Sequence, residues 1–185
     1  MKITLDDING MVEECVKRVI FEQFNRNAIY DYTWVFYNDK EYDPSKVTGI
    51  QYDDPLHVMH NKPYGGLWAS PVDSSLSWKK WCEREEFHLD KLKVPFMFKI
   101  SRDAKIYIID DFEDLKKVSL KKSTYIKNML YIDYKLLELL GFDGIFVTAN
   151  AASSLKCLPM PYEGLGSWDC ESICIFNKNI VIPIN

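Results

Sequence analysis

The chain has 185 residues, which fits one domain and is enough to bury a hydrophobic core without disulfide or metal support. Its formal net charge is −4 and its pI about 5.4, so it lacks the overall basic charge with which nucleic-acid-binding proteins neutralise phosphates. Five irregularly spaced cysteines form no disulfide framework, and no apolar run approaches the ~18 residues of a membrane-spanning helix. These features predict a cytoplasmic protein with reduced thiols and no membrane partner.

Residues 1–30 are predicted to be an amphipathic helix and its connection to the domain. Apolar side chains recur at three- and four-residue steps from Leu5 to Val19, which gives a helix over residues 4–22 one apolar stripe. It carries no evident chemistry, and we expect it to pack on the domain or on a partner. Residues 31–185 then form the domain itself.

The first half of this domain is predicted to contain one helix, at residues 74–87, after a loop at residues 51–66 that is punctuated by proline and glycine. Its strands are identified by β-branched and aromatic residues. They are residues 33–37, 67–69, 94–100 and 105–109.

The second half is predicted to begin with a helix at residues 132–140, which ends at Gly141. Residues 149–167 are predicted to be a long loop. The predicted strands of this half are residues 142–147, 171–176 and 180–184. Strands of this kind with few helices predict an α+β fold of two packed, mainly antiparallel β-sheets with flanking helices.

Metal and thiol chemistry are not predicted. Cys170 and Cys174, like His57 and His60, are close in sequence, but strand residues four positions apart lie about 13 Å from each other and cannot chelate one ion. Cys82 and the nearby His88 fall on different faces of a helix, so Cys82 is predicted to be a buried thiol. No glycine-rich phosphate-binding motif occurs.

Three separated segments carry the polar and aromatic residues from which a cleft can be built. The first, at residues 35–39, is a strand that ends in Tyr37-Asn38-Asp39. The second, at residues 62–82, contains Gly66-Leu67-Trp68-Ala69-Ser70 and then the helical Ser77-Trp78. The third, at residues 167–177, places Asp169 and Glu171 at the start of a strand.

In this order the segments resemble the ADP-ribosyltransferase superfamily, in particular the lineage of poly-ADP-ribose polymerases and diphtheria toxin. That family has a Gly-aliphatic-aromatic strand followed by a small residue and a helix, which residues 66–70 match, and a later strand that opens with glutamate, which residues 171–177 match. Tyr37 or Asn38 stands where the family has histidine or arginine, and Trp68 replaces its tyrosine. The resemblance covers residues 33–82 and 131–182.

The resemblance implies an NAD⁺-dependent transfer of ADP-ribose to a macromolecular acceptor, expected to be a protein, with release of nicotinamide and without a metal. It assigns catalysis to Glu171, with Asp169 orienting the acceptor. The residues that it implies for NAD⁺ binding are Tyr37, Asn38, Gly66, Trp68, Ser70, Ser77 and Trp78.

The residue types suit this chemistry. Cleavage of the nicotinamide–ribose bond passes through an oxocarbenium-like state, which a carboxylate such as that of Glu171 stabilises. Nicotinamide in NAD⁺ is cationic, and Trp68, Trp78 or Trp81 offers a tryptophan face for it. The alternatives are core packing for the tryptophans and a solvated edge-strand acid for Glu171.

Two functional alternatives stay open at this stage. Water as the acceptor would make the protein an NAD⁺ glycohydrolase, and the missing first-motif histidine favours a non-catalytic binding module of the same fold. Asp169 lies two residues before Glu171, so on a strand both side chains share a face. An aspartate there can hold a guanidinium group, which leads to the hypothesis of an arginine acceptor, whereas a turn-forming role for Asp169 is the alternative.

Overall fold

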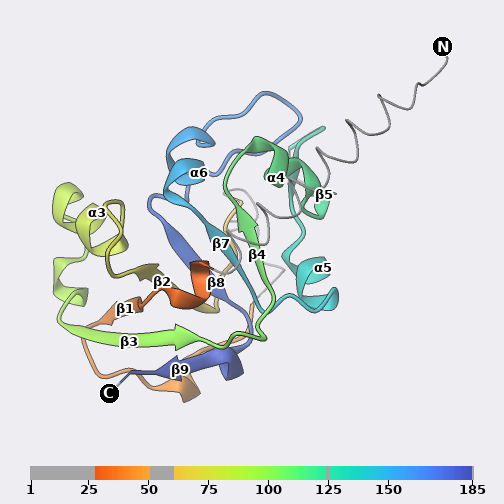
Figure 1. Ribbon diagram of the computed structural model, residues 1–185. Coiled ribbons are helices and arrows are strands. Elements are labelled where there is room, and N and C mark those ends of the chain that lie inside the picture. Colours follow the sequence, from red (N-terminus) through yellow and green to blue (C-terminus); the bar gives the residue numbers. More distant parts are fainter. Residues whose placement is uncertain (1–27, 51–60, 124–125, 185) are drawn as a thin grey trace, which may run out of the picture.

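The structure, a computed structural model, describes residues 28–50, 61–123 and 126–184. The helix predicted over residues 4–22 and most of the predicted loop 51–66 lie outside the described residues. The main feature is a curled seven-stranded sheet in the order β4-β7-β8-β2-β1-β3-β9, accompanied by the two-stranded sheet β5-β6 (Figure 1).

The strands are short, and short helices connect them. The strands are β1 (Trp34–Asn38), β2 (Leu67–Pro71), β3 (Val94–Ile100), β4 (Ile106–Ile109), β5 (Leu120–Lys122), β6 (Leu130–Ile132), β7 (Gly144–Val147), β8 (Ser172–Ile175) and β9 (Val181–Pro183). The helices are α3 (Trp78–Glu85), α4 (Phe112–Lys117), α5 (Tyr134–Leu139) and α6 (Ala149–Ser154), with 3₁₀ turns η1 (Pro44–Lys46), η2 (Leu89–Lys91) and η3 (Lys178–Ile180).

Neighbouring strands of the large sheet run antiparallel except for β4 and β7, which are parallel. Strand β2 belongs to both halves of this sheet. Its residues Leu67 to Ala69 pair with β8, whereas Ser70 and Pro71 pair with β1. The predicted α+β class is therefore confirmed, with one large mixed sheet and one small one.

Side chains alternate between the two faces of the sheet and fill two cores. In β2, Leu67 and Ala69 belong to a core that contains Trp34, Phe98, Phe146 and Ile173. Trp68 lies between Leu67 and Ala69, so its side chain is on the opposite face and packs against the other core, which contains Ile145, Val147, Leu165 and Trp168. Each large side chain buried in this way contributes about 1.5–3 kcal/mol.

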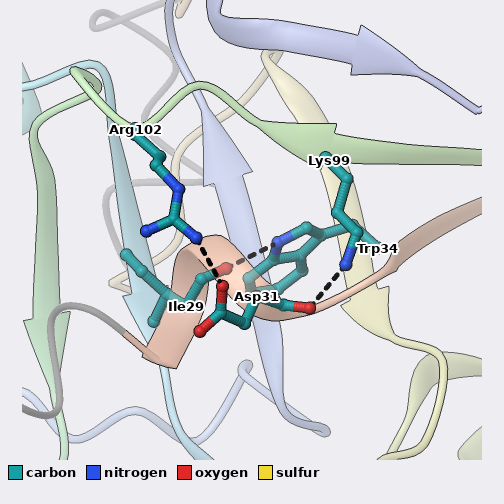
Figure 2. A network of polar contacts seen from close by, with 5 residues as sticks. All are labelled: Ile29, Asp31, Trp34, Lys99 and Arg102. Carbon is teal, nitrogen blue, oxygen red and sulfur yellow. Dashed lines mark hydrogen bonds and ion pairs between the residues drawn. The ribbon is translucent and has the colours of Figure 1, made fainter.

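The start of β1 is fixed by a network of polar contacts around a helical turn at residues 28–31 (Figure 2). The indole Nε1 of Trp34 donates a hydrogen bond to the carbonyl oxygen of Ile29 at 3.3 Å. The Asp31 carboxylate forms an ion pair with Arg102 at 2.9 Å. The backbone carbonyl of Asp31 accepts a hydrogen bond from Nζ of Lys99. These contacts connect the segment before β1 with strand β3 and with the turn that follows β3.

Some predicted elements differ from the observed ones. Residues 149–167 were predicted to be a loop, but they begin with α6, whose N-cap Thr148 accepts a hydrogen bond from the backbone N–H of Ala151. Helix α4 was not predicted; it is held by a reciprocal capping box between Asp111 and Asp114. Six-residue helices are too short to show a full apolar period, so their caps are the main sequence signal.

Candidate functional site

The three segments singled out in the sequence meet around a cleft of about 610 Å³. It lies where β2 passes from its pairing with β8 to its pairing with β1. The lining residues are Val35, Phe36, Tyr37, Asn38, Thr48, Lys62, Pro63, Tyr64, Gly65, Gly66, Trp68, Ala69, Ser70, Trp78, His88, Lys91, Asp169, Cys170 and Ser172.

The wall formed by residues 62–66 is anchored by Asn61, which is 1 % exposed. Its side-chain amide donates to the carbonyl oxygen of Glu163 at 3.1 Å and accepts from the backbone N–H of Ile132 at 2.8 Å. Its backbone carbonyl accepts from the hydroxyl of Tyr134 at 2.7 Å and from the indole of Trp168 at 2.9 Å. Asn61 therefore joins this wall to residues that lie 71 to 107 positions later in the chain.

Gly66 allows this wall to approach β8 closely. Its φ is +71°, and a Cβ atom there would lie 2.8 Å from Sγ of Cys174 and 2.9 Å from the carbonyl oxygen of Ile175. Its N–H donates to the carbonyl oxygen of Thr48 at 2.9 Å. Gly66 lines the cleft as predicted, and its position also requires a residue without a side chain.

Ser70 connects the cleft to the start of α3. Its hydroxyl is buried and accepts from the backbone N–H of Trp78 at 2.9 Å, which places Trp78 at the cleft. Trp78 in turn stacks on Trp81 with ring centroids 5.1 Å apart. Ser77 is the N-cap of α3 and accepts from the backbone N–H of Lys80; it is not among the lining residues, so its observed role is structural.

The indole of Trp68 is already covered by a cation. Nζ of Lys62 lies 4.8 Å from the ring centroid of Trp68 and donates to the carbonyl oxygen of Ser167 at 3.0 Å. The Trp68 ring also packs against Trp168, with centroids 4.8 Å apart, and its Nε1 donates to the carbonyl oxygen of Gly65 at 2.9 Å. Trp68 is thus partly a packing residue, and the ring face under Lys62 is unsuited to a second cation.

Two effects act on the pKa of Lys62 in opposite directions. Burial lowers the pKa of its ammonium group because the charged form loses hydration, and the nearby Asp169 carboxylate partly offsets that change. Lys91 also lines the cleft, but it is ion-paired with Asp39 at 3.0 Å. Asp169 is the one carboxylate among the described lining residues.

Asp169 and Glu171 lie just before a strand and not on it. The strand that the sequence placed at residues 171–176 begins only at Ser172, so alternation does not extend back to Asp169. Asp169 lines the cleft, whereas Glu171 is outside the lining and close enough to Tyr32 to contribute to the raised pKa of that phenol, which is due mainly to burial. Tyr32 packs on Trp34 and Phe146, at the core on the other face of the sheet. Strand alternation, on which the same-face expectation rests, is therefore absent at these two residues, and the arginine acceptor stays a prediction.

The cysteines near the site are buried thiols. Burial raises the pKa of Cys82 to about 11 and raises that of Cys170 as well. Sγ of Cys170 lies 3.9 Å from Oγ of Ser70 and belongs to the cleft lining, whereas Cys82 is fully buried in α3. The prediction that Cys82 is a buried thiol is confirmed.

Sequence reasoning missed Lys62, His88 and Lys91 as cleft residues. His88 has a left-handed backbone conformation, φ 47°, in the turn after α3, and its ring contacts that of Phe87 at 4.0 Å. No periodic sequence pattern indicates such a turn, and a non-glycine residue rarely has a positive φ, so the position of His88 could not be predicted from the sequence.

Within residues 28–50, 61–123 and 126–184, no cluster of three or more histidine, cysteine, aspartate or glutamate side chains is placed to hold a metal ion. Over the same ranges, no helix is both long and apolar enough to cross a membrane. Comparison with protein-family models, with curated proteins and with solved structures gave no match.

Proposed function

We propose that the cleft binds NAD⁺ and that the protein transfers ADP-ribose from NAD⁺ to a protein acceptor. The observation that carries the proposal is the convergence of three segments that are far apart in sequence on one cleft. Of the residues that the family resemblance implied, the cleft collects Tyr37, Asn38, Gly66, Trp68, Ser70, Trp78 and Asp169.

The architecture supports an ADP-ribosyltransferase-like fold. Its two sheets correspond in our interpretation to the two halves of the large curled sheet, β4-β7-β8-β2 and β2-β1-β3-β9, which share β2. The cleft lies along that shared strand, beside the start of β8. A volume of about 610 Å³ falls within the ~300–1,000 Å³ of small-molecule sites.

The cleft residues also define the chemistry of the proposed reaction. The bond between nicotinamide nitrogen and ribose C1′ breaks and its electron pair leaves with nicotinamide. The acceptor forms the new bond to C1′ and releases its proton to solvent. Asp169, rather than Glu171, is the carboxylate within the cleft that would stabilise the oxocarbenium-like state. Trp78 is the tryptophan that offers a ring for the cationic nicotinamide, because the Trp68 ring carries Lys62.

A non-catalytic NAD⁺-binding module is the second candidate. The position of Glu171, the residue that the family resemblance makes catalytic, favours it, because this side chain lies outside the cleft. In that case the cleft would retain the ligand without cleaving it.

Incubation with NAD⁺ labelled in the adenylate moiety, with and without a cell lysate, separates the candidates. Label on a protein band that is absent with Asp169→Asn supports transfer, and free labelled ADP-ribose without a labelled band supports hydrolysis. Saturable NAD⁺ binding without either product supports the binding module. Absence of binding at millimolar NAD⁺ would reject the proposed function.

A further inference from the structure

Lys62 is held inside the cleft from both ends of its side chain. Its backbone follows Asn61, whose buried hydrogen bonds fix the start of the wall. Its Nζ is held by the carbonyl oxygen of Ser167 at 3.0 Å and by the ring of Trp68 at 4.8 Å. A long flexible side chain has therefore lost most of its conformational freedom before any ligand arrives, which lowers the entropic cost of binding.

The charges of the cleft favour an anionic ligand. The chain as a whole has net charge −4, yet the described residues that line its cleft include two lysines, Lys62 and Lys91, and one carboxylate, Asp169. Lys91 is ion-paired with Asp39. The charge of Asp169 raises the pKa of Lys62, but the two side chains are too far apart to form an ion pair. An ammonium group has three N–H donors, and the described contacts of Lys62 include one hydrogen bond, to Ser167.

From this geometry we infer that Lys62 is the phosphate-recognising residue of the cleft. It binds the diphosphate of a nucleotide whose ring is held by the aromatic wall, defined as Phe36, Tyr37 and Trp78. The identity of the whole ligand as NAD⁺ rests on the proposed function, whereas recognition of the diphosphate by Lys62 does not. A buried ammonium group is costly unless an opposite charge lies beside it, and a bound phosphate provides that charge. The hydrogen bond from Nζ to the phosphate is charge-assisted and therefore strong.

This assignment also orients the ligand. The diphosphate lies beside Lys62, whose ammonium group covers the Trp68 ring, so the cationic nicotinamide stacks on the other lining tryptophan, Trp78. Lys62 is then a binding residue that touches the ligand, and Trp68 contributes by holding the ammonium group in place.

The test uses calorimetric titration of the full chain with ADP, inorganic pyrophosphate and the uncharged nucleoside adenosine. The variant Lys62→Met should weaken ADP and pyrophosphate binding about 10- to 100-fold, the scale for one hydrogen bond to a charged group. It should leave adenosine binding within about twofold, because the aromatic wall is unchanged. Lys62→Arg keeps the charge and should retain most of the ADP affinity.

Lys121→Met is the matched control. Lys121 also lies over an aromatic ring, 5.1 Å from the centroid of Tyr131, and forms an ion pair with Asp133, but it is outside the cleft. Its loss should leave ADP affinity unchanged. If Lys62→Met does not fold, wild-type titrations between 50 and 500 mM NaCl replace it. ADP affinity should then fall with salt while adenosine affinity stays constant.

The outcomes separate this inference from the proposed function. ADP binding that depends on Lys62, without NAD⁺ turnover, keeps the phosphate assignment and removes ADP-ribose transfer. NAD⁺ binding or turnover that Lys62→Met leaves unchanged overturns the assignment and keeps the function. Failure of both ADP and pyrophosphate to bind the wild type, or equal ADP loss in Lys121→Met, also overturns the assignment.

Discussion

Asn61 offers the sharpest test of how the cleft wall is built. Asn61→Ala removes two hydrogen bonds and leaves the backbone N–H of Ile132, a fully buried residue, without its acceptor. An unsatisfied buried donor costs about 1–3 kcal/mol, and loss of the second bond, to Glu163, costs about 0.5–1.5 kcal/mol. Alanine at φ 48° adds about 1–2 kcal/mol of backbone strain.

The strain can be measured separately in Asn128→Ala, because Asn128 is exposed and has φ 63°. Asn61→Ala should therefore lower the free energy of unfolding by about 2–4 kcal/mol more than Asn128→Ala does. In a chain of this size that difference corresponds to about 4–16 °C in melting temperature. Urea unfolding followed by circular dichroism checks it. Equal destabilisation of the two variants would refute the role assigned to the Asn61 side chain.

Three further predictions concern the site. Asp169→Asn should lower nicotinamide release about 10²- to 10³-fold in a coupled assay, whereas Glu171→Gln should stay within a few-fold of wild type; the reverse order would restore Glu171 to catalysis. Gly66→Ala should lower the free energy of unfolding by about 2–4 kcal/mol in urea titrations, because the new Cβ would lie 2.8 Å from Sγ of Cys174 and φ is positive. An unchanged free energy of unfolding would contradict the close approach to β8. Iodoacetamide at pH 8 should label the exposed Cys157 rapidly and Cys82 scarcely, since a pKa of about 11 leaves about one thiolate in a thousand; labelling of Cys82 should rise with pH, and comparable rates at pH 8 would show that α3 opens.

The fold was most predictable where a strand carries a continuous apolar and aromatic run. Strand β3 was predicted at residues 94–100 and observed there, because its phenylalanines and isoleucine match a half-buried pleated strand. The parallel pairing of β4 with β7 was not predictable, since it depends on contacts between residues about forty positions apart. The helices α4 and α6 depend on capping side chains, Asp111 and Asp114 for α4 and Thr148 for α6, which a search for periodicity overlooks.

The candidate site was predictable in its segments and not in its side-chain directions. The order of the motifs predicted that residues 35–39, 62–82 and 167–177 form one site, and all three segments line the cleft. Asp169 and Glu171 precede β8, which begins at Ser172, so strand alternation could not predict where their side chains point. Lys62 could not be singled out, because its position depends on contacts with Ser167 and on the anchoring of Asn61 to Trp168.

The central claim is that NAD⁺ occupies the cleft, and hydrogen–deuterium exchange in the presence and absence of saturating NAD⁺ tests it most directly. Bound ligand should slow exchange in residues 35–38, 62–70 and 169–172, the segments that contain most of the lining residues. Residues 112–122, which contain α4 and β5 and lie outside it, should be unaffected. Protection confined to residues outside the cleft, or no protection at millimolar NAD⁺, would contradict the account.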